Sequence, residues 1–421
     1  MRIIMENITN IQWEKINSFI GNTTSKSLGF CRPCPICGSL DSKKVFELNN
    51  FQFYSDSKET PKRFDVTENM CLKCFTLYLN PCYSNYGFSA LFAEAGQSYG
   101  SMLAHTHEQI DWLSNYGLLN DGAYVLDVGC YDGSFLSRLP NSVIKLGVDI
   151  DEPAIIRGRE MHHEKEIQFF HGDFETFLYT SEAPDTITMY HVLEHVARPV
   201  EVLRKLNSIS HDTTKLVIEV PVLDNGNTND IHGFFSIQHT THFSRNSLRN
   251  CLYVAGWSIE EEFMASDYNG FRVLASPLPS DHKYKEIKAE PKDWIDTHDS
   301  LMSWHKSIID AEKSVQSIPE FERCVIWGGG AHSEYLYQLT SFFHIHHQAD
   351  FIIVDSDPMK HGKTWRGIPI YDSSIVNELD WSSTNLLISS YGGQEAIAEA
   401  ADSFNVPEKN IIRLYNTIRR Y

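Results

Sequence analysis

The stretch "YVLDVGCYDGSF", Tyr124 to Phe135, decides the expected fold. An apolar strand runs into a loop in which Gly129 and Gly133 let the backbone pass close to a ligand before a helix begins. The strand-end Asp149 of "LGVDI" lies 22 residues beyond Asp127 and can accept hydrogen bonds from both hydroxyls of a ribose. This spacing indicates a nucleoside-binding edge of a parallel sheet.

A third segment extends the pattern. In "HGDF", 24 residues beyond Asp149, Asp173 stands beside Phe174, a pair suited to an adenine amino group and its ring face. A glycine turn alone is weak evidence, because dinucleotide, flavin and S-adenosylmethionine sites all use one. The ordered set resembles class I S-adenosylmethionine-dependent methyltransferases, whose Asp-x-Gly-x-x-x-Gly loop holds the methionine end. The residues predicted to bind S-adenosylmethionine are Asp127, Gly129, Tyr131, Gly133, Asp149, Ile150, Asp173 and Phe174.

Strands and amphipathic helices alternate from Ala123 to about Leu206, which is typical of a parallel α/β sheet. Two further strands are expected at 215–221 and 271–277. A polar connector follows, then a helix over 297–315 and a second βαβ pattern. This last part carries the loop Gly328 to Gly330 and the strand-end Asp355, which is half of a nucleotide-binding pattern. We expect three domains, at 1–95, 96–280 and 281–421.

Two C-x2-C pairs precede the sheet, in "CPICG" and "CLKC". Each short turn can direct two thiolates at one ion, and four thiolates complete the tetrahedral shell that zinc prefers. Four protein ligands leave no open position for water, so the expected role is structural. Cys31 is either a spare thiol or a substitute ligand. The predicted zinc ligands are Cys34, Cys37, Cys71 and Cys74.

The net charge of −19 and the lack of any Lys/Arg run longer than two predict that nucleic acid is not a partner. No apolar run approaches the roughly 20 residues that span a bilayer, and the first residues lack an apolar signal core. We therefore expect a cytoplasmic protein without membrane association. A hydrophobic content of 42% is ordinary for a globular chain, so disorder is not expected.

The stretch "DTITMYHVLEHVARP" supplies two histidines at the edge of the expected sheet. His191 falls at the carboxyl end of a strand, where ligands of open α/β sheets bind, and His195 is expected to start the next helix. Each has a structural alternative, as a packing or helix-start histidine.

The order of parts resembles one family, the zinc-binding sugar methyltransferases that act on nucleotide-linked deoxysugars and are best known for C-methylation. "CPICG" with "CLKC" matches their N-terminal zinc domain, and "LDVGCYDGSF" with "HVLEHV" matches their class I methyltransferase domain. "VDSDPMKHGKTWRGIPIYD" is similar to a run in their C-terminal Rossmann-like domain, which helps to hold the nucleotide-sugar. The resemblance implies an α/β fold with these three parts and covers nearly the whole chain.

The stretch "FFSIQHTTHFS", Phe234 to Ser244, falls where that family carries a Tyr-His-Glu-His segment followed by Phe-Ser. His239 matches the family's catalytic histidine, but Gln238 replaces the glutamate and Ser236 the tyrosine. A glutamine can polarise a substrate but cannot take its proton. The resemblance also places His195 and Tyr99 near the active site, His195 as a retained histidine and Tyr99 on the approach to the cofactor.

Three interpretations of His239 and His242 stay open. A metal pair is disfavoured, because no Asp, Glu or Cys at ligand spacing accompanies them. For His242 a packing role before the next helix is preferred to a catalytic one. For His239 we expect catalysis, as general base for a sugar hydroxyl or an acidic carbon, with Gln238 or His191 hydrogen-bonding the developing oxyanion.

The expected function is S-adenosylmethionine-dependent methylation of a nucleotide-linked sugar or related polysaccharide precursor, on carbon or on oxygen, by a monomer or homodimer. The loss of the family's Tyr and Glu favours oxygen, since a carbon acid also needs an enolate site. The alternative is a scaffold that binds S-adenosylmethionine and a sugar nucleotide without turnover. The C-terminal domain could also bind a dinucleotide separately.

Overall fold

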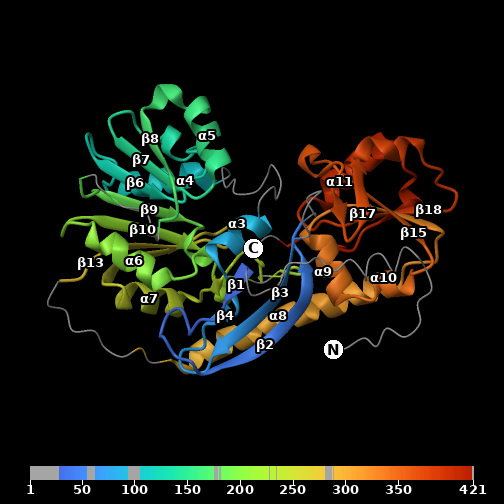
Figure 1. Cartoon of the computed structure of the whole chain (residues 1–421), viewed down its shortest axis with the longest axis horizontal. Helices are drawn as coiled ribbons and strands as arrows, with labels where there is room; N and C mark the ends of the chain where they lie inside the picture. Colours follow the sequence, from blue (N-terminus) through green and yellow to red (C-terminus); the bar gives the residue numbers. More distant parts are fainter. Residues whose placement is uncertain are drawn as a thin grey trace.

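The computed structural model describes residues 28–54, 62–92, 105–174, 179, 182–226, 228–233, 235–279, 287 and 289–419. Figure 1 shows two α/β units, one in green and yellow and one in orange and red, with the long ribbon of β2 and β3 and the helix α8 running beneath and between them. The expected α/β fold class, with an N-terminal cysteine module and a second α/β domain, is confirmed.

The first unit is built on a seven-stranded sheet of order β12-β13-β10-β9-β6-β7-β8. All neighbours pair in parallel except β13, which is antiparallel to both β10 and β12. The central strands β6 and β10 are buried along nearly their whole length, as in parallel sheets that helices cover on both faces. The strands are β6 (Tyr124–Val128), β7 (Ile144–Asp149), β8 (Ile167–His171), β9 (Thr186–Tyr190), β10 (Lys215–Val220), β12 (Trp257–Met264) and β13 (Phe271–Pro277). The helices are α4 (Thr106–Asn115), α5 (Glu152–Met161), α6 (Pro199–Ser208) and α7 (Arg245–Val254).

The N-terminal module has a four-stranded antiparallel sheet of order β11-β4-β3-β2 and a small β1-β5 pair. Its edge strand β11 (Thr241–His242) comes from the sequence assigned to the second domain and pairs with β4. The module and the methyltransferase-type unit therefore share a sheet. The other elements are β1 (Gly29–Phe30), β2 (Ser42–Gln52), β3 (Arg63–Cys71), β4 (Leu77–Leu79), β5 (Cys82–Tyr83) and α3 (Asn85–Phe92).

The C-terminal unit has a six-stranded sheet of order β16-β17-β15-β14-β18-β19, parallel apart from β16. The long helix α8 begins at Pro291, six residues before the expected Thr297, because Glu290 caps it and proline suits its first turn. The strands are β14 (Arg323–Trp327), β15 (Asp350–Asp355), β16 (Thr364–Trp365), β17 (Ile368–Asp372), β18 (Thr384–Ile388) and β19 (Ile411–Ile412). The helices are α8 (Pro291–Gln316), α9 (Ala331–Leu339), α10 (Phe342–Ile345) and α11 (Gln394–Ser403).

Short 3₁₀ turns complete the described elements. They are η2 (Leu136–Arg138), η3 (His163–Lys165), η4 (Leu193–His195), η5 (Leu223–Asn225), η6 (Pro358–Lys360), η7 (Ser373–Glu378) and η8 (Glu408–Asn410).

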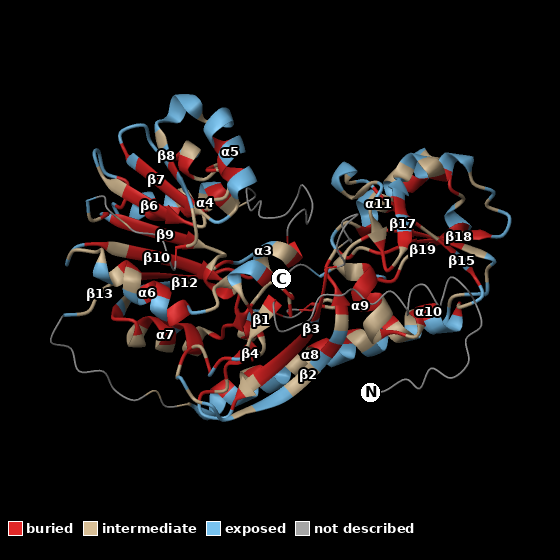
Figure 2. Ribbon diagram, in the orientation of Figure 1, coloured by how far each residue is buried: buried red, intermediate tan, exposed pale blue. Residues whose placement is uncertain are grey.

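Buried side chains cross the expected domain borders. One core joins Phe51 and Phe53 of the N-terminal module to Tyr335 of α9, and the rings of Phe51 and Tyr335 lie 5.1 Å apart. A second core joins Cys34 and Cys71 to the seven-stranded sheet. Figure 2 shows the central strands in red and the outer face of α5 in pale blue. Within the described segments, none of the helices has both the length and the apolar character needed to span a membrane.

Candidate active site

The loop after β6 has the backbone that its glycines predict. Gly129 and Gly133 have φ of +79° and +75°, in the left-handed region that favours glycine. A Cβ on Gly129 would lie 2.2 Å from Val192 Cγ2, and one on Gly133 would lie 2.4 Å from Phe169 Cζ. Tyr131, between them, also has a positive φ of 50°. The loop is thus fixed at the carboxyl edge of the sheet, where ligands of open α/β sheets bind.

Two carboxylates lie beside this loop. Asp149 ends β7 and accepts backbone N–H bonds from Tyr131 at 2.7 Å and from Asp151 at 2.8 Å. Asp127 accepts the hydroxyl of Thr188 at 2.7 Å. Burial raises the pKa of Asp127 to about 7 against the opposing effect of that hydrogen bond, and burial raises the pKa of Asp149 as well. These groups suit the polar end of a nucleoside ligand.

The remaining predicted cofactor residues border the same edge. Phe174 is buried, and the ammonium of Lys205 lies 5.0 Å from its ring centre. Asp173 accepts a bond from Asn85 of α3, so the N-terminal module reaches the predicted adenine pocket. Ile150 is 44% exposed at the end of β7, available to cover a ligand. Tyr99 lies outside the described residues.

His191 follows β9 and belongs to a buried ionic network. Its Nε2 lies 3.2 Å from Glu219 Oε1, and Glu219 also pairs with the fully buried Arg272. Burial acts to lower the pKa of His191, but Glu194 and Glu219 overcome it and raise the pKa to about 9. Burial acts to raise the pKa of Glu219, but His191 and Arg272 lower it to about 2. His191 is therefore a cation held at the sheet edge.

His195 and His239 meet beside it, with ring centres 4.9 Å apart. The prediction that His195 starts a helix is wrong. His195 ends the turn η4, and α6 begins only at Pro199, because proline suits the first turn of a helix. Burial, then the neighbouring His195, lower the pKa of His239 well below its ordinary value, so its imidazole is neutral at neutral pH. The carboxylate of Glu194 lies in the same cluster, and its ligand atom is within 4.8 Å of those of both histidines.

Gln238 has an aromatic neighbour that the sequence did not reveal. Its Nε2 donates to the phenol oxygen of Tyr54, which follows β2 in the N-terminal module. Ser236 does not provide the family's tyrosine, since its hydroxyl accepts the Gln238 N–H at 3.4 Å within the turn. A phenol is therefore present at this site, supplied from a different part of the chain.

His242 is held apart from this cluster in the fold. It is buried in β11, and its Nε2 lies 2.8 Å from Glu68 Oε1 on β3. Its ring centre is 5.9 Å from that of His239. The geometry supports the packing role for His242 and separates it from the reacting edge.

The four predicted zinc ligands converge. Sγ of Cys34 and Cys74 lie 3.6 Å apart, and those of Cys37 and Cys71 lie 3.5 Å apart. Tetrahedral zinc with bonds of about 2.3 Å requires sulfurs roughly 3.8 Å apart, so the cage fits that ion. Cys31 is exposed and is not among these four. Zinc at this site would stabilise the module and supply no chemistry, because the four thiolates fill its shell.

Arg32 connects this cysteine cage to the histidine cluster. It lies two residues before Cys34, is 8% exposed, and donates to the backbone carbonyls of Leu79, Ala197 and Thr240. Ala197 follows η4, and Thr240 directly follows His239. One guanidinium therefore connects the cysteine module to both histidine segments.

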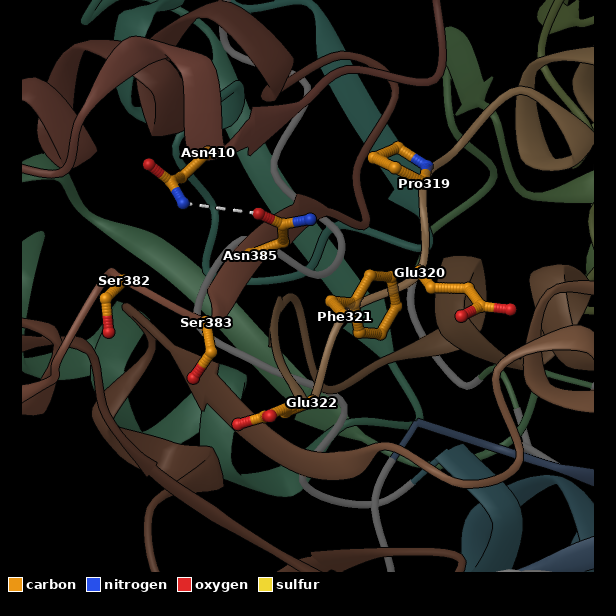
Figure 3. A pocket seen from close by; sticks show the side chains of 8 residues that line it. All are labelled: Pro319, Glu320, Phe321, Glu322, Ser382, Ser383, Asn385 and Asn410. Carbon is orange, nitrogen blue, oxygen red and sulfur yellow. Dashed lines mark hydrogen bonds between the residues drawn. The ribbon is translucent and has the colours of Figure 1, made fainter.

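The C-terminal unit also presents a glycine loop at the carboxyl end of a strand. Gly329 N–H and Lys360 Nζ each lie 2.9 Å from Asp355 Oδ2. A separate hollow in this unit lies at the amino ends of β14 and β18, at the opposite edge, and Asn410 bonds Asn385 within it (Figure 3). Its lining residues are Pro319, Glu320, Phe321, Glu322, Ser382, Ser383, Asn385 and Asn410. Ligands of such sheets bind at the carboxyl ends of the strands, and of these two places only the glycine loop lies at that edge.

Four residues at or near the site escaped the sequence analysis: Tyr54, Glu194, Glu219 and Arg32. Glu194 stood in the quoted "HVLEHV", and its place between two histidines was an available signal. Glu219 was hidden inside an apolar strand, "KLVIEVP", where a lone carboxylate signals a buried partner. Tyr54 and Arg32 carry no local signal, because their contacts reach 184 and up to 208 residues along the chain.

Several solved structures are similar to part of this chain, at low sequence identity. A magnesium protoporphyrin IX methyltransferase from Synechocystis PCC 6803 with bound S-adenosylmethionine is 20% identical, with 41% of this chain and 77% of that chain covered and a TM-score of 0.33. A methyltransferase from Aquifex aeolicus is 16% identical, with 43% and 96% covered and a TM-score of 0.37. One from Mesorhizobium loti is 15% identical, with 41% and 99% covered and a TM-score of 0.35. No curated protein matches.

A comparison with protein families matches residues 103–262 to a family described as a methyltransferase domain. This segment contains the glycine loop, Asp149 and the histidine cluster. Residues 103–262 are therefore similar to a methyltransferase domain.

Proposed function

We propose that this protein transfers the methyl group of S-adenosylmethionine to a nucleotide-linked sugar or related polysaccharide precursor. The observation that carries the proposal is the convergence of Gln238, His239 and His195 at the edge that holds the cofactor loop, with Tyr54 of the N-terminal module beside them. The order of parts, which resembles that of sugar methyltransferases, supports the substrate class. The glycine loop at Gly328 and Asp355 of the C-terminal unit offer a place for the nucleotide.

S-adenosylmethionine, when bound, supplies an electrophilic methyl group. The residues of this chain position the nucleophile and manage its proton. His239 is the proposed general base: the O–H or C–H bond of the substrate breaks and its proton passes to the imidazole. The freed electron pair forms the bond to the methyl carbon as the sulfur–methyl bond breaks, and its electron pair stays on the sulfur of the departing S-adenosylhomocysteine. Gln238 and Tyr54 can hydrogen-bond the oxygen on which negative charge develops.

The methylated atom follows from how well that oxyanion is stabilised. A sugar hydroxyl needs only a placed base, whereas a carbon next to a ketone also needs donors for the enolate oxygen. Gln238 cannot replace a carboxylate as base, which favours oxygen. The phenol of Tyr54 can donate a hydrogen bond to an enolate oxygen, and the sequence alone did not reveal this group. The proposal therefore includes methylation on carbon as well as on oxygen.

The test incubates the zinc-loaded full-length protein with methyl-labelled S-adenosylmethionine and a panel of nucleotide-linked keto sugars and their reduced counterparts. Mass spectrometry and carbon-13 NMR then locate the methyl group. His239→Ala should abolish transfer while S-adenosylhomocysteine still binds, and His163→Ala, at an exposed imidazole, serves as the control. If His239→Ala methylated the substrate at the rate of the parent, His239 would not be the general base. The lack of any methylated sugar would overturn the substrate class.

A further inference from the structure

The carboxylate of Glu194 lies at the centre of the histidine cluster. It is 1% exposed, and among the described residues neither oxygen has a hydrogen-bond partner. Its contacts to His191 Nδ1 at 3.7 Å and to His195 Nε2 at 3.9 Å are longer than hydrogen bonds. The ion pair with His191 compensates the charge of this buried carboxylate, but it leaves both oxygens without a hydrogen bond, so they can accept a further ligand.

The groups around it form a set of metal donors. One oxygen of Glu194 and one nitrogen each of His195 and His239 lie within 4.8 Å of one another. Bonds of about 2.1 Å to one ion would bring such atoms to roughly 3 to 3.5 Å, a change that side-chain rotation can supply. Two histidines and one carboxylate suit divalent transition metals and leave further positions open.

The histidines are already oriented for this role. His195 Nδ1 lies 3.1 Å from the carbonyl oxygen of Gln238, so Nδ1–H donates and the lone pair of Nε2 faces Glu194. Metal-binding histidines are held in this way by a carbonyl or carboxylate on the other nitrogen. The N–H of Thr240 donates to the carbonyl of Glu194 at 2.7 Å, which fixes the two segments to each other.

We propose that Glu194, His195 and His239 bind one divalent transition-metal ion, separate from the zinc in the cysteine cage, and that this ion binds the substrate oxygen. The metal pair of His239 and His242, which the sequence disfavoured, is not this site, because His242 is paired with Glu68.

This inference rests on the proposed methyl transfer and refines how the proton is released. A cation polarises a bound hydroxyl, so the O–H bond breaks with the proton passing to solvent. The alkoxide electron pair then forms the O–CH₃ bond as the C–S bond breaks. His239 acts as base in the metal-free protein and as ligand when the ion is bound. No redox change is involved.

The test measures Mn²⁺ binding to the zinc-loaded full-length protein by electron paramagnetic resonance and calorimetry. The variant Glu194→Gln keeps the shape and removes the charge, and Glu201→Gln, at an exposed glutamate of α6, is the matched control. We expect one Mn²⁺ per chain in the parent and control, and an affinity at least about tenfold lower in Glu194→Gln. Equal S-adenosylhomocysteine binding by all three proteins shows that they are folded.

Failure of the parent to bind Mn²⁺, or equal binding by Glu194→Gln, overturns the site. If Glu194→Gln does not fold, His239→Gln, which lies outside the helices and strands, takes its place with the same expected loss. Methyl transfer with and without Mn²⁺ separates the two proposals. Glu194-dependent Mn²⁺ binding with no sugar methylated keeps the site and overturns the proposed function. Methylation that Mn²⁺ does not accelerate overturns the role of the ion in catalysis.

Discussion

At the scale of single residues, alanine substitutions at Gly129 and Gly122 separate the cost of backbone strain from the cost of a steric clash. Gly129 and Gly122 share nearly the same φ, +79° and +78°, but a Cβ on Gly122 would meet no atom within 4 Å. We predict that Gly122→Ala costs only the left-handed strain, about 1–2 kcal/mol. Gly129→Ala should pay that cost and also displace Val192, so that the affinity for S-adenosylhomocysteine falls at least about tenfold. Titration calorimetry measures the affinity of both variants for S-adenosylhomocysteine. An equal fall in affinity in Gly122→Ala and Gly129→Ala would contradict the prediction.

Asp127 gives a pH-dependent prediction. Its pKa is raised from 3.8 to about 7 in the folded chain, so the unfolded chain releases the proton first as pH rises. Folding stability contributed by this group is therefore present below pH 3.8 and lost as pH rises to about 7, by on the order of 4 kcal/mol at most. Asp127→Asn does not titrate. Its free energy of unfolding, measured by urea titration without ligand, should rise relative to the parent between these pH values and stay level above them.

At the scale of elements, the catalytic edge depends on how η4 and the segment before β11 are held together. Arg32 donates to the carbonyls of Ala197 and Thr240 from a turn of the cysteine module. A lysine at this position would keep the positive charge, but its single ammonium lacks the planar guanidinium with which Arg32 reaches several carbonyls. His195 and His239 lie next to those two carbonyls, so their separation depends on this side chain.

We predict that Arg32→Lys lowers kcat by about tenfold, since small displacements of catalytic groups are costly. S-adenosylhomocysteine affinity and zinc content should stay near those of the parent, because the cofactor loop and cysteines are not contacted by the fork. Arg204→Lys, at an exposed arginine that also donates to a backbone carbonyl, is the control. An unchanged kcat in Arg32→Lys would refute the positioning role.

At the scale of the whole molecule, the cysteine module is part of the architecture rather than an attachment. Its sheet takes β11 from the methyltransferase region, and its aromatic side chains share a core with α9 of the C-terminal unit. Figure 1 shows its long ribbon between the two α/β units. Loss of the metal should therefore affect regions far from the four sulfurs.

Cys71→Ser tests this coupling. We predict that zinc content falls, that the melting temperature drops by on the order of 10 °C, and that methyl transfer is lost with the metal. Cys31→Ser removes an exposed thiol outside the cage and should match the parent in all three measurements. A Cys71→Ser protein that lost zinc but kept full activity would show that the module does not support the catalytic edge.

Much of the fold could be predicted because it is encoded locally. Val125 to Val128 lie in a buried strand followed by Gly129, and Asp149 stands 21 residues after Val128, so the loop and the strand-end carboxylate followed from spacing. The shared sheet could not be predicted. Thr241 and His242 pair with Tyr78 and Leu77, and no periodicity in so short a segment specifies a partner that far along the chain.

The sequence by itself determined the α/β class, the glycine loop after β6 and the four-cysteine cage, because each depends on residue types at short, regular spacing. Tertiary structure alone decided that His239 meets Glu194 and His195 rather than acting with His242, and that Tyr54 reaches Gln238. The physical reason is that these contacts join residues 44 to 184 positions apart. Such contacts arise only when sheet edges and loops pack, which local patterns do not encode.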